Sequence, residues 1–151
     1  MRSIISLLIL SISFGLLAQR VAFEDPDLSF SFKKPKGWEV VDDGYVVKVS
    51  PSIADTSTTC FAITYFESPK PVGDIPLDLQ LQIDSTETPT SKTKIAGEEA
   101  NWFEETSENF ISRHYTFFKF NQRFEITIKY PIESKYDKKL KSIIRSIKVK
   151  Q

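Results

Sequence analysis

The sequence predicts an α+β domain built on an antiparallel β-sheet with flanking helices. Two aromatic-rich extended runs lie in succession between Phe110 and Tyr130, and a helical pattern from Ser134 to Ile147 follows them directly. Shorter strand-like runs, separated by turns that contain Gly or Pro, fill much of the region before them. We expect the long hairpin and the helix to form the core.

Residues 1–18 have the pattern of a cleaved Sec-type signal peptide. An apolar run from Ile4 to Leu17 follows Met1-Arg2, and Ala18 supplies a small residue at the expected cleavage point. A membrane anchor is the alternative, but the run is short for a bilayer span and is interrupted by serines and a glycine. We therefore predict an exported protein, periplasmic or extracellular and not integral to the membrane, whose residues 19–151 form one domain.

Composition narrows the classes of partner. The 20 Lys and Arg residues balance the 20 Asp and Glu residues, so a nucleic acid is not expected as a partner. The distribution is uneven, because residues 132–151 carry seven basic and two acidic side chains. A single cysteine, Cys60, excludes an intramolecular disulfide, and a buried apolar role is favoured over a reactive thiol.

The first half of the domain is predicted to be a polar lead followed by four strands. We expect residues 19–27 to be loosely held and residues 28–32 to form the first strand, since apolar residues alternate with serines there. A hairpin over residues 38–49 turns at Gly44, where a positive φ is needed. Residues 60–67 form the fourth strand after a polar loop.

The segment from Ile75 to Ile83 is ambiguous. Four apolar residues alternate with polar ones as in a strand, whereas the composition, Asp74 as an N-cap and Pro76 in a first turn favour a helix. Residues 85–94 are expected to be a polar loop. Residues 95–103 then form a turn that leads into a strand.

The long hairpin has two possible registers. A two-residue turn at Asn121-Gln122 pairs Phe117 with Ile126, whereas a three-residue loop pairs Phe118 with Ile126. The two registers place opposite faces of the strand toward the core. Asn tolerates a left-handed backbone but no Gly follows it, so both registers stay open. Apolar residues on both faces of the first run predict a central strand.

The helical pattern predicts one apolar and one basic face. Its start resembles a capping box, with Ser134 followed by Asp137. One stripe, expected to lie on the sheet, consists of Tyr136, Leu140, Ile143, Ile144 and Ile147. The opposite side carries Lys138, Lys141 and Arg145, the candidate protein-docking face. The alternative is an ordinary solvated helix face.

Four parts of the sequence resemble the PsbP-like family. Residues 32–38 give an aromatic followed by Pro-x-Gly-Trp, and residues 95–100 give Ile-x-Gly-x-x-Ala. The aromatic strand pair at 110–130 and the closing helix and strand at 136–149 also occupy the family's places. The resemblance covers most of the chain from residue 28 onward.

The resemblance implies an α/β/α sandwich, shared with a eukaryotic Ran-binding protein and with bacterial periplasmic proteins. It also implies a helix from Leu77 to about Ser85. Members of known function act by binding, and the photosystem II extrinsic subunit helps a membrane complex to retain calcium and chloride. We do not carry that role over, because no motif here matches its ion-retaining residues.

No pattern predicts a catalytic, metal or cofactor site. His114 is the only histidine and has no nucleophile motif beside it. Carboxylate pairs occur at Asp42-Asp43, Glu98-Glu99 and Glu104-Glu105. Neighbours on a strand point to opposite faces, so each pair puts one carboxylate on each side. Trp38 and Trp102 are expected to be core or lid aromatics.

Two hypotheses follow from different classes. In the first, the protein is a non-enzymatic binding or accessory module that recognises a protein partner, for example an envelope component. In the second, the sheet and the C-terminal helix enclose a pocket for a small apolar ligand. A pocket filled by side chains would argue against the second hypothesis.

Overall fold

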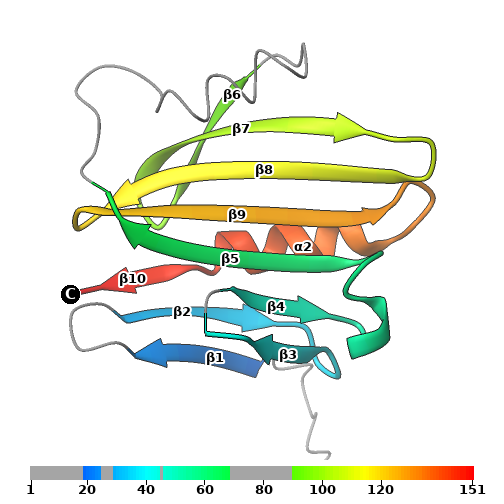
Figure 1. Cartoon of the computed structure of the whole chain (residues 1–151), viewed down its shortest axis with the longest axis horizontal. Coiled ribbons are helices and arrows are strands. Elements are labelled where there is room, and N and C mark those ends of the chain that lie inside the picture. Colours follow the sequence, from blue (N-terminus) through cyan, green and yellow to red (C-terminus); the bar gives the residue numbers. More distant parts are fainter. Residues whose placement is uncertain (1–18, 25–28, 45, 69–89) are drawn as a thin grey trace, which may run out of the picture.

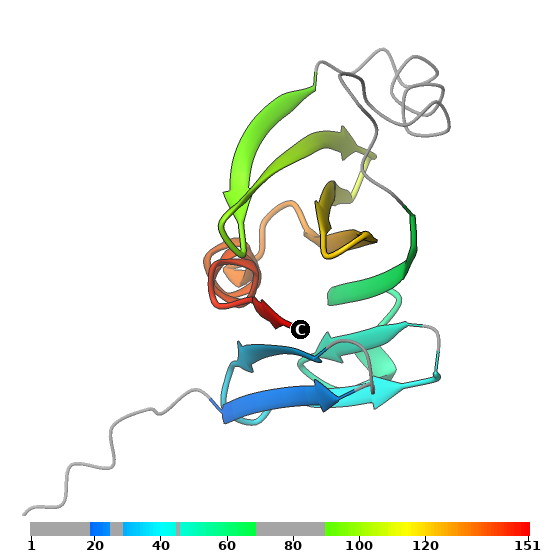
Figure 2. The ribbon, with the colours of Figure 1, turned by 90° about the vertical axis from the view of Figure 1, so that its left-hand side faces the viewer.

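The computed structural model describes residues 19–24, 29–44, 46–68 and 90–151. Two antiparallel sheets dominate this part of the chain. The larger has seven strands in the order β3-β4-β5-β9-β8-β7-β6, and the smaller has three in the order β1-β2-β10. Helix α2 (Tyr136–Arg145) lies against the concave side of the curved larger sheet (Figures 1 and 2).

The strands of the larger sheet are β3 (Glu39–Asp42), β4 (Val47–Ser50), β5 (Cys60–Glu67), β6 (Ser91–Ile95), β7 (Glu98–Thr106), β8 (Phe110–Lys119) and β9 (Gln122–Pro131). Those of the smaller sheet are β1 (Gln19–Glu24), β2 (Ser29–Lys34) and β10 (Lys148–Lys150). A short 3-10 turn, η1 (Ile53–Asp55), follows β4.

The α+β class and the antiparallel pairing are confirmed, but the predicted architecture needs correction. The strands form two sheets and not one, and the described residues contain one α-helix. Among the described residues, a helix therefore covers one face of the larger sheet. The signal peptide predicted for residues 1–18 and the helix predicted from Leu77 to Ser85 lie outside the described residues.

Two segments expected to be irregular form strands. Residues 19–24, predicted as a loose lead, form β1 and pair with β2 along their whole length. Residues 91–95, mostly assigned to a polar loop, form β6 and pair with β7. Both are edge strands, and edge strands keep the polar residues that the sequence pattern associates with loops.

The turn between β8 and β9 contradicts both registers expected for the hairpin. Lys119 pairs with Gln122 and Phe117 pairs with Phe124, so the two turn residues are Phe120 and Asn121. Both have a positive φ, 51° and 57°, as a type I′ turn requires. Phe117 and Phe124 face the core on neighbouring strands, as they would also do with the two-residue turn at Asn121-Gln122, one of the two alternatives.

The core lies between the concave face of the sheet and α2. Phe117 and Phe124 stack with their ring centroids 4.7 Å apart, and both are fully buried. Leu140 and Ile143 from the predicted apolar stripe are also fully buried. Most of the stripe is therefore buried against the sheet, as predicted. Within the described residues, no helix is long and apolar enough to cross a membrane.

Helix α2 begins without the predicted capping box. Its N-cap residue is Lys135, which makes no capping side-chain hydrogen bond, and the hydroxyl of Ser134 accepts only a long bond, 3.5 Å, from the Tyr136 amide. The carboxylate of Asp137 is held instead by side chains of the sheet and of the next helical turn. Because these donors bind its carboxylate, the side chain of Asp137 does not turn back to Ser134 as a capping box requires.

Candidate functional site

One flank of α2 faces β8 and carries the groups of the candidate site. At about 100° per residue, Asp137, Lys141 and Ile144 fall in one row beside the buried stripe. Ile144 is buried, while Asp137 and Lys141 are half-buried. The row thus brings one carboxylate and one ammonium group from the helix to the edge of the core.

Asp137 is the centre of a hydrogen-bond network that joins α2 to two strands. Its Oδ1 accepts hydrogen bonds from the Arg113 guanidinium on β8 and, at 2.8 Å, from the Tyr130 hydroxyl on β9. Its Oδ2 accepts one from Nζ of Lys141 at 2.9 Å. Three donors, from β8, β9 and α2 itself, therefore bind one carboxylate.

Arg113 is held from several sides. Its Nε donates to Oε2 of Glu104 at 2.5 Å, and Glu104 lies directly opposite on β7. The guanidinium carbon lies 5.9 Å from the Trp102 ring centre and 5.7 Å from that of Tyr130. Only 13% of its side chain is exposed. A charge this far buried has to be paired, and two carboxylates pair it.

The network shifts the pKa values of its members. Burial would raise the pKa of Asp137, but hydrogen bonds from Lys141, Tyr130 and Arg113 outweigh burial and lower it. Burial would lower the pKa of Arg113, but its hydrogen bonds to Asp137 and Glu104 raise it. Burial and the hydrogen bond to Asp137 raise the pKa of Tyr130. At neutral pH the network therefore contains an ionised Asp137, a charged Arg113 and a protonated Tyr130.

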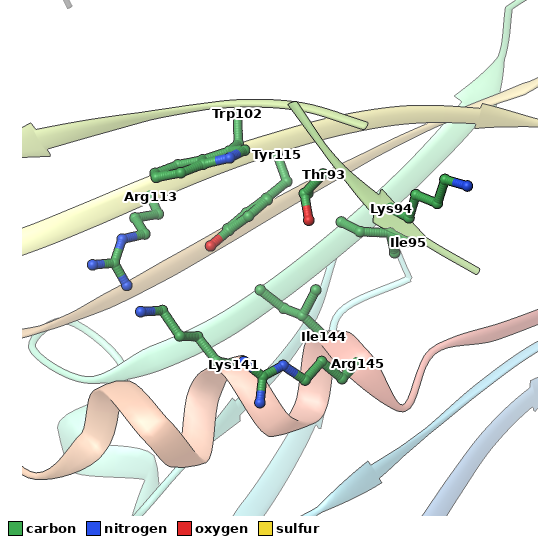
Figure 3. A pocket seen from close by; sticks show the side chains of 9 residues that line it. All are labelled: Thr93, Lys94, Ile95, Trp102, Arg113, Tyr115, Lys141, Ile144 and Arg145. Atoms are coloured by element: carbon green, nitrogen blue, oxygen red, sulfur yellow. The ribbon is translucent and has the colours of Figure 1, made fainter. Parts of the chain in front are cut away.

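A groove of about 210 Å³ opens beside this network, between α2 and strands β6 to β8. Trp102 and Tyr115 form one wall, stacked with ring centroids 5.8 Å apart and an angle of 23° between the planes. Arg113 and Lys141 extend toward each other across one end (Figure 3). The remaining lining residues are Thr93, Lys94, Ile95, Ile144 and Arg145.

The groove is cationic in character. Four of its lining residues are basic, and none of the described residues that line it is acidic. Asp137 and Glu104 neutralise part of this charge from behind. Lys94 extends away from the other three cations (Figure 3). The groove therefore differs from the apolar pocket that the second hypothesis expected under the helix.

The structure separates the three residues of the predicted docking face. Lys138 and Arg145 are exposed on the outer side of α2. Lys141 is half-buried, pairs with Asp137 and lines the groove. The reason is its angular position, since Lys141 lies closer to Ile144 around the helix than Lys138 does. Lys141 is therefore not part of the exposed basic face on the outer side of α2.

The outer face continues onto β10. A second, shallower hollow lies between β10 and the turn that joins β6 to β7, and four cations line it: Lys94, Arg145, Lys148 and Lys150. All four residues are exposed. Among the described residues that line this hollow, none is acidic. We call Lys138, Arg145, Lys148 and Lys150 the basic strip.

The other residues considered from the sequence have structural surroundings. His114 stacks on Phe103 with ring centroids 4.8 Å apart, and its ring nitrogens lie 3.2 Å from Glu105 and from Thr127. Cys60 is buried, and burial raises the pKa of its thiol. Trp38 is a core residue, as expected.

Two of the three carboxylate pairs have different partners for their two members, as predicted, whereas Asp42 and Asp43 accept hydrogen bonds from the nearby amides of Gly44 and Val46. Glu104 binds Arg113 on the concave side of the sheet, whereas Glu105 contacts His114 on the other side. In the same way Glu98 pairs with Lys119 and its neighbour Glu99 with a different lysine. Within the part of the chain that the structure describes, no group of three or more His, Cys, Asp or Glu residues could hold a metal ion.

Sequence reasoning missed Arg113, Tyr115 and Trp102 as site residues. A signal was present, because Arg113 interrupts the alternation of Ile111, Tyr115 and Phe117 on the buried face of a strand. A charged side chain at an inward position requires a partner. Its pairing with Glu104 depends on the register between β7 and β8, which the sequence does not contain.

Comparison with solved structures identifies the fold. A crystal structure of a Bacteroides thetaiotaomicron protein aligns with a TM-score of 0.59 and 20% identity over 81% of this chain. The chain spans 45% of the length of that protein. The solution structure of cyanobacterial PsbP from Synechocystis sp. PCC 6803 aligns with a TM-score of 0.57 and 14% identity, over 91% of this chain and 96% of that one.

The protein thus belongs to the class of α+β domains in which antiparallel sheets pack against a C-terminal helix. Within that class it has a PsbP-like fold, as the sequence resemblance implied. No protein-family model matches the chain, and no curated protein matches it. At these identities the comparisons establish the fold, and the site has to be interpreted from its own residues.

Proposed function

We propose that this is an exported, non-enzymatic accessory protein that binds the acidic surface of a protein partner through its basic strip. The observation that carries the proposal is a set of exposed cations on α2 and β10: Lys138, Arg145, Lys148 and Lys150. The last three line one hollow, and Lys138 lies two turns before Arg145 on the same helix. Charge complementarity of this kind steers a partner and fixes its orientation.

The charge distribution supports an acidic partner. The chain as a whole is neutral, so the strip stands out from the rest of the surface and not from a generally basic protein. The side chains are long and exposed, as is usual at the polar rim of a transient interface. The strip also lies outside the core, so it is free to vary without loss of the fold.

Export rests on the leader-like residues 1–18, whose pattern supports a periplasmic or extracellular location for the partner as well. The partner class is therefore a protein of the cell envelope or of the exterior with an acidic surface.

A charge-reversal experiment tests the proposal. The variant Lys138→Glu with Arg145→Glu is immobilised beside the wild type, and capture of envelope proteins is compared at low and at physiological salt. We expect the variant to lose the partner that the wild type retains, and the wild type to lose it as salt rises. A matched control, Lys36→Glu with Lys92→Glu, reverses two exposed cations outside the strip and should retain capture. If the strip variant captured the partner as well as the control variant does, the basic strip would be excluded as the binding surface.

A further inference from the structure

We propose that the groove between α2 and β8 is a binding site for a small monocarboxylate with a flat apolar body. This ligand differs in class from the protein partner of the basic strip. The two sites share Arg145, but Lys138, Lys148 and Lys150 do not line the groove. The proposal rests on three properties of the groove, namely fixed donors, net charge and an aromatic wall.

The donors are fixed before any ligand arrives. Nε of Arg113 is bound to Glu104 and Nη1 to Asp137, which leaves Nη2 as the guanidinium nitrogen that these carboxylates do not use. The Lys141 ammonium gives one hydrogen to Asp137 and has two more donors. Both groups are therefore held at the groove, and preorganised donors reduce the entropy lost on binding.

The charges call for a monoanion. Of the four basic lining residues, Lys94 extends away from the others (Figure 3). Arg113, Lys141 and Arg145 remain, and two carboxylates, Asp137 and Glu104, are bound to the first two of these. One positive charge remains after this pairing. A carboxylate matches this remainder and the planar geometry of a guanidinium, whereas a dianionic phosphate would exceed the charge.

The wall favours a flat apolar body. Trp102 and Tyr115 lie stacked along one side, and Ile95 and Ile144 add aliphatic surface (Figure 3). Aromatic rings bind other rings by offset stacking or by their edges. The Tyr115 hydroxyl is hydrogen-bonded to Arg113, and burial raises its pKa further above neutral, so it is a protonated group at the groove.

The size limits the ligand. The volume of about 210 Å³ is below the range of roughly 300–1,000 Å³ that holds drug-sized molecules. A molecule the size of benzoate fits this limit. We therefore take benzoate as the probe and benzamide as its neutral counterpart of nearly equal shape.

The test is a titration of the full domain with benzoate, benzamide and inorganic phosphate, followed by two-dimensional amide NMR. We expect benzoate to bind with a dissociation constant of about 1 mM and to shift amides of β7, β8 and α2. Benzamide and phosphate should each bind at least about tenfold more weakly. Binding of benzamide as tight as that of benzoate, or no binding of benzoate, would overturn the proposal.

Variants locate the site. Lys141→Met should weaken benzoate binding about tenfold, since it removes one charged donor and leaves Arg113 in place. Lys138→Met is the matched control on the same helix and should bind as the wild type does. Trp102→Leu removes part of the wall and should weaken benzoate more than it weakens acetate. Equal losses in the two lysine variants would show a general charge effect and contradict the assignment.

Discussion

The guanidinium of Arg113 on β8 is bound to the carboxylate of Asp137 in the first turn of α2. These two residues lie 24 positions apart, and their contact joins the helix to the centre of the larger sheet. Tyr130 and Lys141 bind the same carboxylate, so one side chain of the helix has partners on two strands and on the next helical turn.

Removal of Arg113 is expected to destabilise the fold. Arg113→Met leaves Asp137 and Glu104 without their shared cation, and we expect a loss of about 2–4 kcal/mol in the free energy of unfolding. Urea titration followed by circular dichroism measures it. Lys92→Met is the control, because Lys92 and Glu99 form an exposed pair at 2.8 Å, and its loss should be below about 1 kcal/mol. Equal losses would show that the Asp137 network is no more than a surface pair.

The protein is expected to lose stability in acid through Asp137. The folded-state pKa of Asp137 is lowered, so the unfolded chain binds a proton first as the pH falls. Its contribution is complete above the unfolded pKa of about 3.9 and is lost as the pH falls through the folded value. Stability measured from pH 7 to pH 3 should therefore fall less steeply in Asp137→Asn than in the wild type. Parallel curves would contradict this assignment.

Tyr130 predicts a second loss of stability at alkaline pH. The folded-state pKa of Tyr130 is raised, so above about pH 10 the unfolded chain loses the phenol proton first. The contribution is complete below the unfolded pKa and disappears as the pH rises toward the folded one. Tyr130→Phe should reduce this alkaline slope and cost about 1 kcal/mol at neutral pH. Phenolate absorbance during a pH titration reports the ionisation directly.

The β8–β9 turn offers a stabilising substitution. Phe120 and Asn121 both have a positive φ, and the ring of Phe120 is 43% exposed. Asn-Gly is the preferred pair for such a turn, so Phe120→Asn with Asn121→Gly should raise the free energy of unfolding by about 0.5–1 kcal/mol.

Gly97 supplies the converse test of backbone conformation. It lies in the turn between β6 and β7 at a φ of +88°, and a Cβ there would meet nothing within 4 Å. Gly97→Ala should therefore cost about 1 kcal/mol through conformation alone. If the alanine variant were as stable as the wild type in urea titration, the turn would have to change its conformation.

The sequence predicted most of the central strands because their alternation is strong. Residues 60–67 and the run up to Tyr130 have aromatic and β-branched side chains in a regular pattern, and they form β5 and β9. The edge strands β1 and β6 were missed, since a strand with one paired side and little burial carries almost no apolar pattern. Their existence depends on the partner strand.

The candidate site was predictable only in part. The basic character of α2 follows from the sequence, and so does the exposure of Lys138 and Arg145. The groove does not follow from the sequence. It requires the register that places Glu104 opposite Arg113 and the twist that brings β6 over the helix. Contacts between residues far apart in the chain decide both features.

The smaller sheet has a consequence for the order of folding. Its strands β2 and β10 pair residues from opposite ends of the described chain, and the Lys33 amide donates to Oγ of Ser146 across 113 positions. Contacts of such long range close large loops and form slowly. As the chain folds, β2 therefore lacks its second neighbour until the residues near Lys150 are in place. Over that interval β2 presents an unpaired edge, to which chaperones or other chains can bind.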